Sequence, residues 1–299
     1  MSLIDVFAAQ PALFIGACAL VGLLVGSFLN VVIHRLPVML ERQWRLECAR
    51  LAPGSEAGAA EERFNLVVPR SACPACRAPI TAWQNIPILS YLALRGRCAA
   101  CRAPISVRYP LVEALTGVLS AAVAWRFGFG APAGAALVLT WFLIALTFID
   151  LDTQYLPDNL TLPLLWLGLL VSLTGTAGTQ ASIPVDLRSS VLGAAVGYLC
   201  LWSVYQLFRL ATGKEGMGYG DFKLLGALGA WLGWQLILPI VLVAAACGAL
   251  VGALVLAIQG RTRATPLAFG PYLAASGWLM LLCGHEIVAR YLGLFAGRP

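Results

Sequence analysis

The feature that most constrains the fold of this chain is a series of long apolar segments that recurs along its whole length. A helix that crosses a bilayer needs about 20 mainly apolar residues. Only 11% of the residues are charged, whereas soluble domains carry about 25%. The sequence therefore predicts an all-α polytopic membrane protein with about eight transmembrane helices. We expect these at 12–33, 110–128, 133–149, 160–177, 189–210, 222–235, 236–258 and 266–289.

One polar segment, 34–108, interrupts this series after the first apolar stretch. It contains 11 of the 20 Lys and Arg residues and five acidic residues, so its net charge is +6, the formal charge of the whole chain. The positive-inside rule places such a segment in the cytosol. We therefore expect three parts: a first transmembrane helix within 1–33, a cytosolic segment at 34–108 and a seven-helix membrane domain at 109–299.

Eight spans would leave both termini outside and three further connections inside, at 150–159, 210–221 and 259–265. The second and third of these connections and their flanks carry basic residues, as the positive-inside rule requires. These residues are Arg209, Lys214, Arg261 and Arg263. The orientation places the acidic residues near 150 and 221 on the same face.

Two C-x-x-C pairs, Cys73 with Cys76 and Cys98 with Cys101, lie in the predicted cytosolic segment. Their separation is close to the spacing typical of four-cysteine zinc sites. Zinc binds four thiolates tetrahedrally, and disulfides are rare in the reducing cytosol. A structural zinc ion in a small zinc-ribbon-like module is the favoured prediction, and redox-active cysteines or a chance pattern are the alternatives.

Carboxylates at the edge of apolar segments are the second candidate site, because charge near the bilayer interior is costly and is usually functional. Asp150 and Asp152 end one apolar segment and Asp221 begins another. Two facing aspartates that share a proton can hydrolyse a peptide bond. Asp150 and Asp152 lie about 200° apart on a helix, so only one of them can face Asp221. The alternative is a polar pair that only holds helices together.

The residues around Asp221 read Gly-Met-Gly-Tyr-Gly-Asp-Phe-Lys at 216–223. This stretch lacks the lysine followed by serine or threonine of a phosphate-binding loop, so a nucleotide site is not expected there. Asp152 and Asp158 are expected to cap a helix or to lie on a solvated surface, with Asn159 as the alternative cap. We expect no nucleic-acid partner.

Several long motifs in order resemble one family, the bacterial type IV prepilin leader peptidases of the GxGD aspartic type. Besides the cysteine pairs, they are Gly-Ser-Phe-Leu-Asn-Val-Val-Ile-His-Arg-Leu-Pro at 26–37, Arg-Tyr-Pro-Leu-Val-Glu at 108–113, the stretch 150–158 ending in Leu-Pro-Asp, Gly-Tyr-Gly-Asp at 218–221 and Pro-Leu-Ala-Phe-Gly-Pro-Tyr at 266–272. The resemblance covers nearly the whole chain.

The resemblance implies a bifunctional inner-membrane enzyme. It would remove the basic leader of type IV prepilins and type II secretion pseudopilins at the cytosolic face. It would then methylate the new N-terminal amine with S-adenosylmethionine. The catalytic aspartates of the family correspond to Asp150 and Asp221, and its Gly-basic pair before the third cysteine corresponds to Gly96 and Arg97, candidates for methyl transfer.

The remaining candidates keep a structural alternative beside the functional one. Asn30 and His34 lie on one face of the first helix and either bind substrate backbone or cofactor or hydrogen-bond the helix end. Glu113 either pairs with an arginine or serves methyl transfer. Gly270 and Pro271 either kink the last span or unwind it to pair with substrate, and Gly218 and Gly220 are further substrate-binding candidates.

Two other functions stay open at this level. The first is a leader peptidase without methyltransferase activity, in which the zinc module is only structural. The second belongs to another class, a proton-coupled transporter with aspartates in the proton path. A transporter is expected to have carboxylates near the membrane midplane and internal repeats, whereas these aspartates lie at one predicted face.

Overall fold

The computed structural model describes residues 3–51, 63–174, 185–259 and 268–295. Within these residues every regular element is a helix, and the only β-structure is two isolated bridges, Ala72 to Pro79 and Arg97 to Pro104. The elements in chain order are α1 (Leu3–Ala9), α2 (Pro11–Leu51), η1 (Ala82–Asn85), α3 (Leu89–Ala93), α4 (Arg108–Phe127), α5 (Ala131–Thr153), α6 (Asp158–Ser172), α7 (Leu187–Thr212), α8 (Tyr219–Leu232), η2 (Trp234–Leu236), α9 (Ile237–Gln259) and α10 (Gly270–Phe295).

The all-α membrane architecture is confirmed, and each of the eight predicted apolar segments falls on one of the helices α2 and α4 to α10. Within the described residues, five helical segments are long and apolar enough to cross a membrane. These are Pro11–Leu51, Arg108–Phe127, Ala131–Thr153, Leu187–Thr212 and Trp234–Ile258. Helix α6 is apolar but shorter. The count of eight spans remains a prediction.

Some sequence expectations fall wholly or partly outside the described residues. They are the basic residues Arg261 and Arg263 in the third inside connection, most of the connection itself, and the first two residues of the 266–272 motif.

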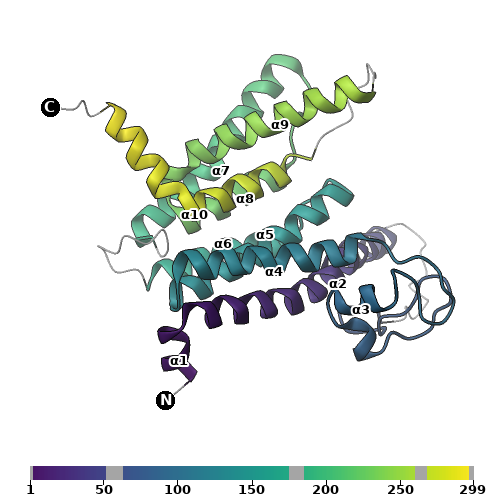
Figure 1. Cartoon of the computed structure of the whole chain (residues 1–299). Coiled ribbons are helices and arrows are strands. Elements are labelled where there is room, and N and C mark those ends of the chain that lie inside the picture. The colour runs from purple at the N-terminus through teal and green to yellow at the C-terminus, as the bar shows by residue number, and fades with distance from the viewer. Residues whose placement is uncertain (1–2, 52–62, 175–184, 260–267, 296–299) are drawn as a thin grey trace. The chain divides into compact units, whose positions relative to one another are not determined.

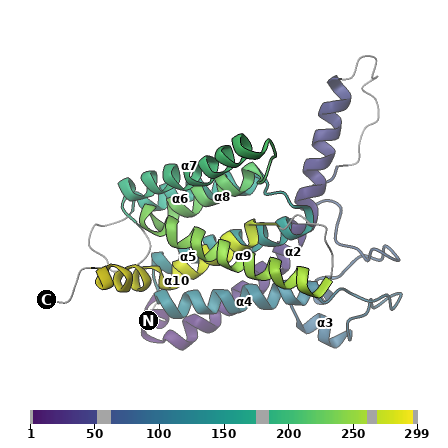
Figure 2. The same ribbon diagram turned by 90° about the horizontal axis from the view of Figure 1, so that it is seen from above.

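The chain divides into two compact units, residues 1–122 and 123–299. In the first unit, α2 does not end where the membrane span was expected to end. It continues without interruption through Pro37 to Leu51. Figure 2 shows this C-terminal part of α2 extending away from α3 and α4.

Helices α2 and α4 of the first unit pack closely because two glycines face the partner helix. A Cβ atom at Gly22 would lie 2.5 Å from the Ser120 hydroxyl, and one at Gly26 would lie 2.8 Å from the Cα atom of Glu113. The Gly22 and Gly26 pair forms the small-xxx-small pattern that permits close contact of membrane helices. This packing brings Glu113 to the α2 surface.

In the second unit, α8 is the central helix, because 11 of its 14 residues are buried. The Trp231 indole donates to the Leu164 carbonyl of α6 at 2.8 Å, and the Ser190 hydroxyl of α7 donates to the Ala230 carbonyl. Gly193 of α7 and Gly229 of α8 lie against each other's backbone. Figure 1 shows α7 and α9 beside α8. The packing fixes α8, which carries Asp221 in its first turn.

Candidate functional site

The four predicted zinc ligands come together between α2 and α4. Each C-x-x-C pair forms a tight turn: the Cys73 N–H donates to the Ala78 carbonyl at 2.9 Å, and the Cys98 N–H donates to the Ala103 carbonyl at 2.8 Å. One ligand atom from each of Cys73, Cys76, Cys98 and Cys101 lies within 4.8 Å of the others. The cluster is therefore built from two equivalent turns.

The equivalence of the two turns is also visible in the sequence, beyond the spacing of the cysteines. Both follow the pattern Cys-x-Ala-Cys-Arg-Ala-Pro-Ile, at 73–80 and 98–105. The arginines in the repeat, Arg77 and Arg102, adopt left-handed backbone angles with φ of 58° and 61°. Each isolated bridge spans the same positions of its repeat. The module thus consists of one eight-residue turn used twice.

The geometry of the sulfur atoms fits a tetrahedral metal. Cys73 Sγ and Cys101 Sγ are 3.8 Å apart, and four sulfurs at about 2.3 Å from a tetrahedral zinc are separated by about 3.8 Å. Hydrogen bonds from the backbone N–H groups of Cys101 and then Ala100 lower the pKa of the Cys98 thiol to about 6. The pKa of the Cys101 thiol is instead raised to about 11, because the lowering effect of the Ala103 N–H is outweighed by the neighbouring thiols and by burial. The fit to zinc therefore rests on four cysteine sulfurs at tetrahedral spacing.

Gly96, a methyl-transfer candidate, has a structural reason to be glycine. Its φ is +68°, and a Cβ atom there would lie 2.9 Å from the Tyr91 hydroxyl. Its carbonyl accepts the Ile105 N–H at 2.8 Å, which connects the α3 turn to the second cysteine turn. Arg97 is exposed. Of this pair, Arg97 has the side chain that is available to a ligand.

Glu113 of α4 has hydrogen-bond partners from two other segments of the first unit. Its carboxylate is buried and accepts the Ile88 N–H at 2.8 Å, with the Ser27 hydroxyl of α2 as a second hydrogen-bond partner. Ser27 Oγ lies 3.5 Å from the side-chain oxygen of Asn85. Ile88 is held at φ +59°, a costly conformation for a β-branched residue. A buried carboxylate therefore joins α2, α4 and the segment before α3.

Asn30 and His34 have different surroundings. The Asn30 amide donates to the Tyr109 carbonyl near the start of α4 at 3.1 Å, which matches the structural alternative of hydrogen bonding at a helix end. His34 is exposed. The two side chains share a helix face, and in this structure only Asn30 has a defined role, which is to connect α2 to α4.

The two aspartates of the second candidate site are both buried, although they are 71 positions apart in the sequence. Asp150 lies in the last turn of α5 and is 4% exposed, whereas Asp221 lies in the first turn of α8 and is 8% exposed. Leu156 connects their surroundings, since it lies against Gly220, which precedes Asp221, and near Gly270, which contacts Asp150. Asp152 is exposed, so of the two aspartates near the end of α5 only Asp150 is buried.

Glycine 270 contacts the Asp150 carboxylate directly. The Gly270 N–H donates to Asp150 Oδ2 at 3.0 Å, and a Cβ atom at Gly270 would lie 2.5 Å from the same oxygen. The expectation of a kink inside the last span was wrong within the described residues, because α10 begins at Gly270. Proline suits the position after a helix start since the N–H it lacks has no helical acceptor there. The first N–H of α10 therefore serves the carboxylate.

The two glycines before Asp221 differ in the space around them. A Cβ atom at Gly220 would lie 2.7 Å from the Leu156 Cβ, whereas one at Gly218 would meet no atom within 4 Å. Leu156 is buried in the connection between α5 and α6 and also lies near Gly270. Gly220 is therefore needed for packing beside the aspartates, and Gly218 faces open space.

Asp158 is partly exposed, does not occupy the cap position of α6 and has an ion-pair partner. Pro157 occupies the position before α6, and the Lys223 ammonium donates to both Asp158 carboxylate oxygens, at 2.6 and 2.8 Å. Sequence reasoning assigned no role to Lys223. The sequence could have identified Lys223, since a charged residue within an apolar helix, two residues after Asp221, is itself a functional candidate.

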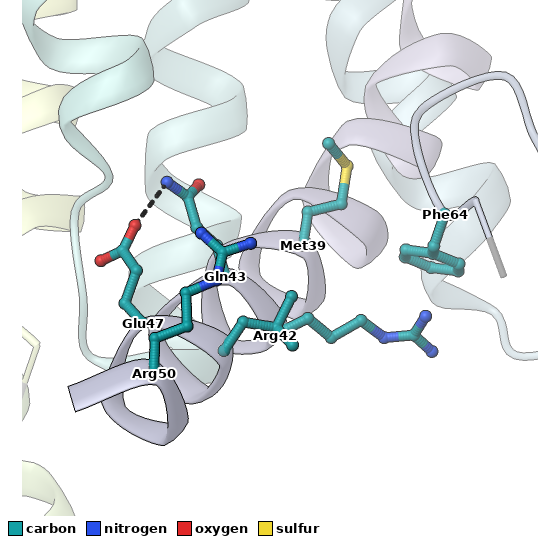
Figure 3. A pocket seen from close by; sticks show the side chains of 7 residues that line it. Met39, Arg42, Gln43, Glu47, Arg50 and Phe64 are labelled. Atoms are coloured by element: carbon teal, nitrogen blue, oxygen red, sulfur yellow. Dashed lines mark hydrogen bonds between the residues drawn. The ribbon is translucent and has the colours of Figure 1, made fainter. Parts of the chain in front are cut away.

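A shallow groove of about 280 Å³ lies along the extension of α2. Two of its lining side chains have partners: the Arg42 guanidinium lies 4.3 Å above the Phe64 ring, and the Gln43 amide donates to the Glu47 carboxylate at 3.0 Å. Figure 3 shows Arg42 directed toward Phe64. The groove contains none of the candidate residues and belongs to neither site. Its lining residues are Met39, Arg42, Gln43, Leu46, Glu47, Arg50 and Phe64.

Comparison with known families matches this chain in two stretches. Residues 20–127 match the bacterial peptidase A24 N-terminal domain, and residues 137–253 match the type IV leader peptidase family. A relative from Stutzerimonas stutzeri is 52% identical over 294 residues, which covers 98% of each chain. This chain belongs to the type IV leader peptidase family. No solved structure matches it.

Other members of the leader peptidase family are equally similar over their length. The relative from Aeromonas hydrophila is 53% identical and covers 98% of this chain and 99% of its own. The relative from Neisseria gonorrhoeae is 50% identical over 90% of each chain. Each of these three proteins is named a prepilin leader peptidase/N-methyltransferase. The four cysteines and Glu113 lie in the first matched stretch, and Asp150 and Asp221 lie in the second.

Proposed function

We propose that this chain is a prepilin leader peptidase and N-methyltransferase of the bacterial inner membrane. It cleaves the basic leader of type IV prepilins, and of type II secretion pseudopilins, at the cytosolic face and methylates the amine that cleavage releases. The observation that supports the peptidase activity most directly is the buried pair of Asp150 and Asp221. The full-length similarity to relatives named for both activities supports the combination.

Cleavage requires one proton shared by the two aspartates. The ionised carboxylate takes a proton from water as the water oxygen attacks the scissile carbonyl carbon, and the protonated carboxyl group donates to the carbonyl oxygen. When the tetrahedral intermediate collapses, the leaving amine takes the proton that the first carboxylate had accepted from water, and a hydroxyl proton of the intermediate returns to the second carboxylate. The Gly270 N–H on Asp150 Oδ2 stabilises the ionised form of that carboxylate, which favours Asp150 as the base and Asp221 as the acid.

Substrate residues that flank the scissile bond need access to this pair. Gly218, in open space one turn before Asp221, is the favoured contact for the substrate backbone. The other three candidates instead set the backbone around the carboxylates. Gly220 does so through its contact with Leu156, and Gly270 and Pro271 do so as the first residues of α10. Asn30 and His34 are the substrate-binding candidates of the first unit.

S-adenosylmethionine supplies the methyl group for the second reaction. An amine must lose its proton before its nitrogen can accept a methyl group, so this step needs an acceptor for that proton. The buried Glu113 carboxylate, held by the Ile88 N–H and by Ser27, is the candidate acceptor. Arg97 is the candidate for an anionic group of the methyl donor, and Gly96 sets the backbone that presents it.

The zinc ion in this proposal is structural. Cys73, Cys76, Cys98 and Cys101 would supply all four ligands, so the metal has no open position for substrate. Its contribution is to fix the two turns that carry Arg97 and the segment leading to Ile88.

Purified full-length protein in lipid nanodiscs provides the test. It is incubated with a prepilin peptide that has a basic leader and phenylalanine after the cleavage point, together with methyl-labelled S-adenosylmethionine. We expect the mass spectrum to show cleavage before phenylalanine and one added methyl group on the product. Cleavage without label would show peptidase activity without methyltransferase activity, and no cleavage would refute the proposal.

Glu113→Gln separates the two reactions, since it keeps the size and hydrogen bonding of the side chain and removes the charge. We expect labelling to fall at least tenfold while cleavage changes less than about twofold. Equal loss of both reactions would show that Glu113 only supports the fold of the first unit.

A further inference from the structure

Lys223 and Asp158 form the best-defined ion pair near the two aspartates. The Lys223 ammonium lies 2.6 and 2.8 Å from the two carboxylate oxygens of Asp158, so a single donor group contacts both. Both side chains are partly buried, with 28% and 45% of their surface exposed. An ion pair that is partly shielded from water is stronger and more directional than one on an open surface.

Each partner of the ion pair is connected to one of the two aspartates. Lys223 follows Asp221 by two residues within the same helix, so the two move together. Asp158 follows Asp150 by eight residues, through the connection from α5 to α6. That connection is itself constrained: Gln154 has φ of 53° and its N–H donates to the Asp150 carbonyl at 2.8 Å.

Leu156, in the middle of this connection, packs against Gly220, which precedes Asp221, and near Gly270, which donates to Asp150. A Cβ atom at Gly220 would lie 2.7 Å from Leu156 Cβ, and one at Gly270 would lie 3.2 Å from Leu156 Cδ1. A movement of the connection would therefore displace the backbone on which Asp221 rests and the glycine that donates to Asp150. The ion pair between Lys223 and Asp158 holds this connection in place, because it attaches its end to α8.

We propose that Lys223 and Asp158 are a positioning pair, which fixes the separation of the Asp150 and Asp221 carboxylates through Leu156. The inference rests on the proposed peptidase function and adds residues that act through the aspartates and do not touch the substrate. The packing of α6 on α8 does not depend on the pair, since the Trp231 contact with Leu164 lies two turns further along α8. Loss of the pair loosens the start of both helices and leaves their packing intact.

The test measures kcat and KM for prepilin cleavage by purified full-length variants. Lys223→Met and Asp158→Asn are each expected to lower kcat at least tenfold with KM changed less than about twofold, because small displacements of catalytic groups lower the rate strongly. The double variant is expected to lose no more than either single variant, since each already breaks the pair. Lys223→Arg keeps the charge and is expected to retain at least a third of kcat.

Glu286→Gln is the matched control, because it removes another partly exposed ion pair of the same unit, with Arg126 at 3.3 Å. Its kcat is expected to equal that of the unmodified protein. An unchanged kcat in Lys223→Met, or additive losses in the double variant, would overturn the proposal. Asp150→Asn, assayed in parallel, separates this outcome from failure of the proposed function: if it still cleaves, the aspartic mechanism itself is wrong.

Discussion

The two candidate sites of this protein are built in opposite ways. The four cysteines lie within 29 residues of one another along the chain, on two turns that repeat the same eight-residue pattern. Asp150 and Asp221 are far apart in sequence, and their surroundings are built by packing between helices: α8 packs among α6 and α7, and the start of α10 reaches Asp150 of α5. The geometry of one site comes from local backbone turns whose four cysteines could hold a metal ion, and that of the other from packing between helices.

This difference predicts how each site responds to damage. A metal site in a small module contributes its binding free energy to folding, so loss of one ligand affects the whole module. A carboxylate pair within packed helices adds little to stability, since buried charge is costly to desolvate. Substitutions at the aspartates should therefore remove activity without unfolding the protein, whereas substitutions at the cysteines should do both.

The largest effect is expected at the aspartates. Asp150→Asn and Asp221→Asn should each lower cleavage by about three orders of magnitude or more, and the double variant should lose little beyond that, because the pair acts as a unit. Protein yield should stay near normal, since a buried charge is removed and none is created. Quantitative mass spectrometry of the cleaved peptide measures the effect.

Asp152→Asn is the control for this prediction, because Asp152 lies two residues away and is exposed. It should keep most of the activity. If Asp152→Asn were inactive and Asp150→Asn active, the assignment of the catalytic residue on α5 would be wrong. Inhibitors of serine, cysteine and zinc peptidases should not affect cleavage.

The second prediction concerns pH. The active state carries one proton shared between the two carboxylates, so a rise in pH that removes the proton eliminates the acid, and a fall that protonates both eliminates the base. A plot of kcat against pH should therefore be bell-shaped. A rate that increases steadily with pH would contradict a shared proton.

Gly270→Ala tests the contact between α10 and Asp150. The added methyl group would lie 2.5 Å from Asp150 Oδ2, so the carboxylate must move, and a displacement near 1 Å is expected to lower kcat about 100-fold. Gly134→Ala is the matched control, because its methyl group meets no atom within 4 Å and Gly134 lies on α5 away from the site. Equal rates for the two variants would show that the position of Asp150 does not depend on Gly270.

The metal prediction concerns the first unit. Purified protein should contain one zinc ion per chain by elemental analysis, and Cys73→Ser should lower the zinc content at least tenfold and decrease labelling with methyl more than cleavage. Zinc release should increase as the pH falls, since protonated thiols do not bind metal. Cys48→Ser, outside the cluster, should retain the metal. Protein without zinc and with reactive or paired thiols would exclude the site.

The smallest effect is expected at the Gly-basic pair. Gly96→Glu would test a role in methyl transfer, but the positive φ of Gly96 and its contact with Tyr91 make this variant also a test of folding. Arg97→Gln avoids this problem, because Arg97 is exposed. It should decrease labelling about tenfold and leave cleavage within about twofold. Loss of both activities would indicate that Arg97 supports the fold.

The sequence by itself determined the features that depend on local pattern. Apolar length gave the helices, and the spacing of the cysteines gave the four members of the cluster, because two turns of a few residues each bring their own ligands together. Helical periodicity separated Asp150 from Asp152, and the structure buries the first and exposes the second. These inferences need no knowledge of how distant segments meet.

Only the tertiary structure decided what surrounds those residues. It placed the Gly270 N–H on Asp150, attached Asp158 to Lys223, packed Leu156 against Gly220 and joined Glu113 to the Ile88 N–H. Local preference gave a different answer in two cases, a cap for Asp158 and a kink at Gly270. A side chain near a helix end has several acceptable partners nearby in sequence, and packing between helices, which the local pattern does not contain, selects among them.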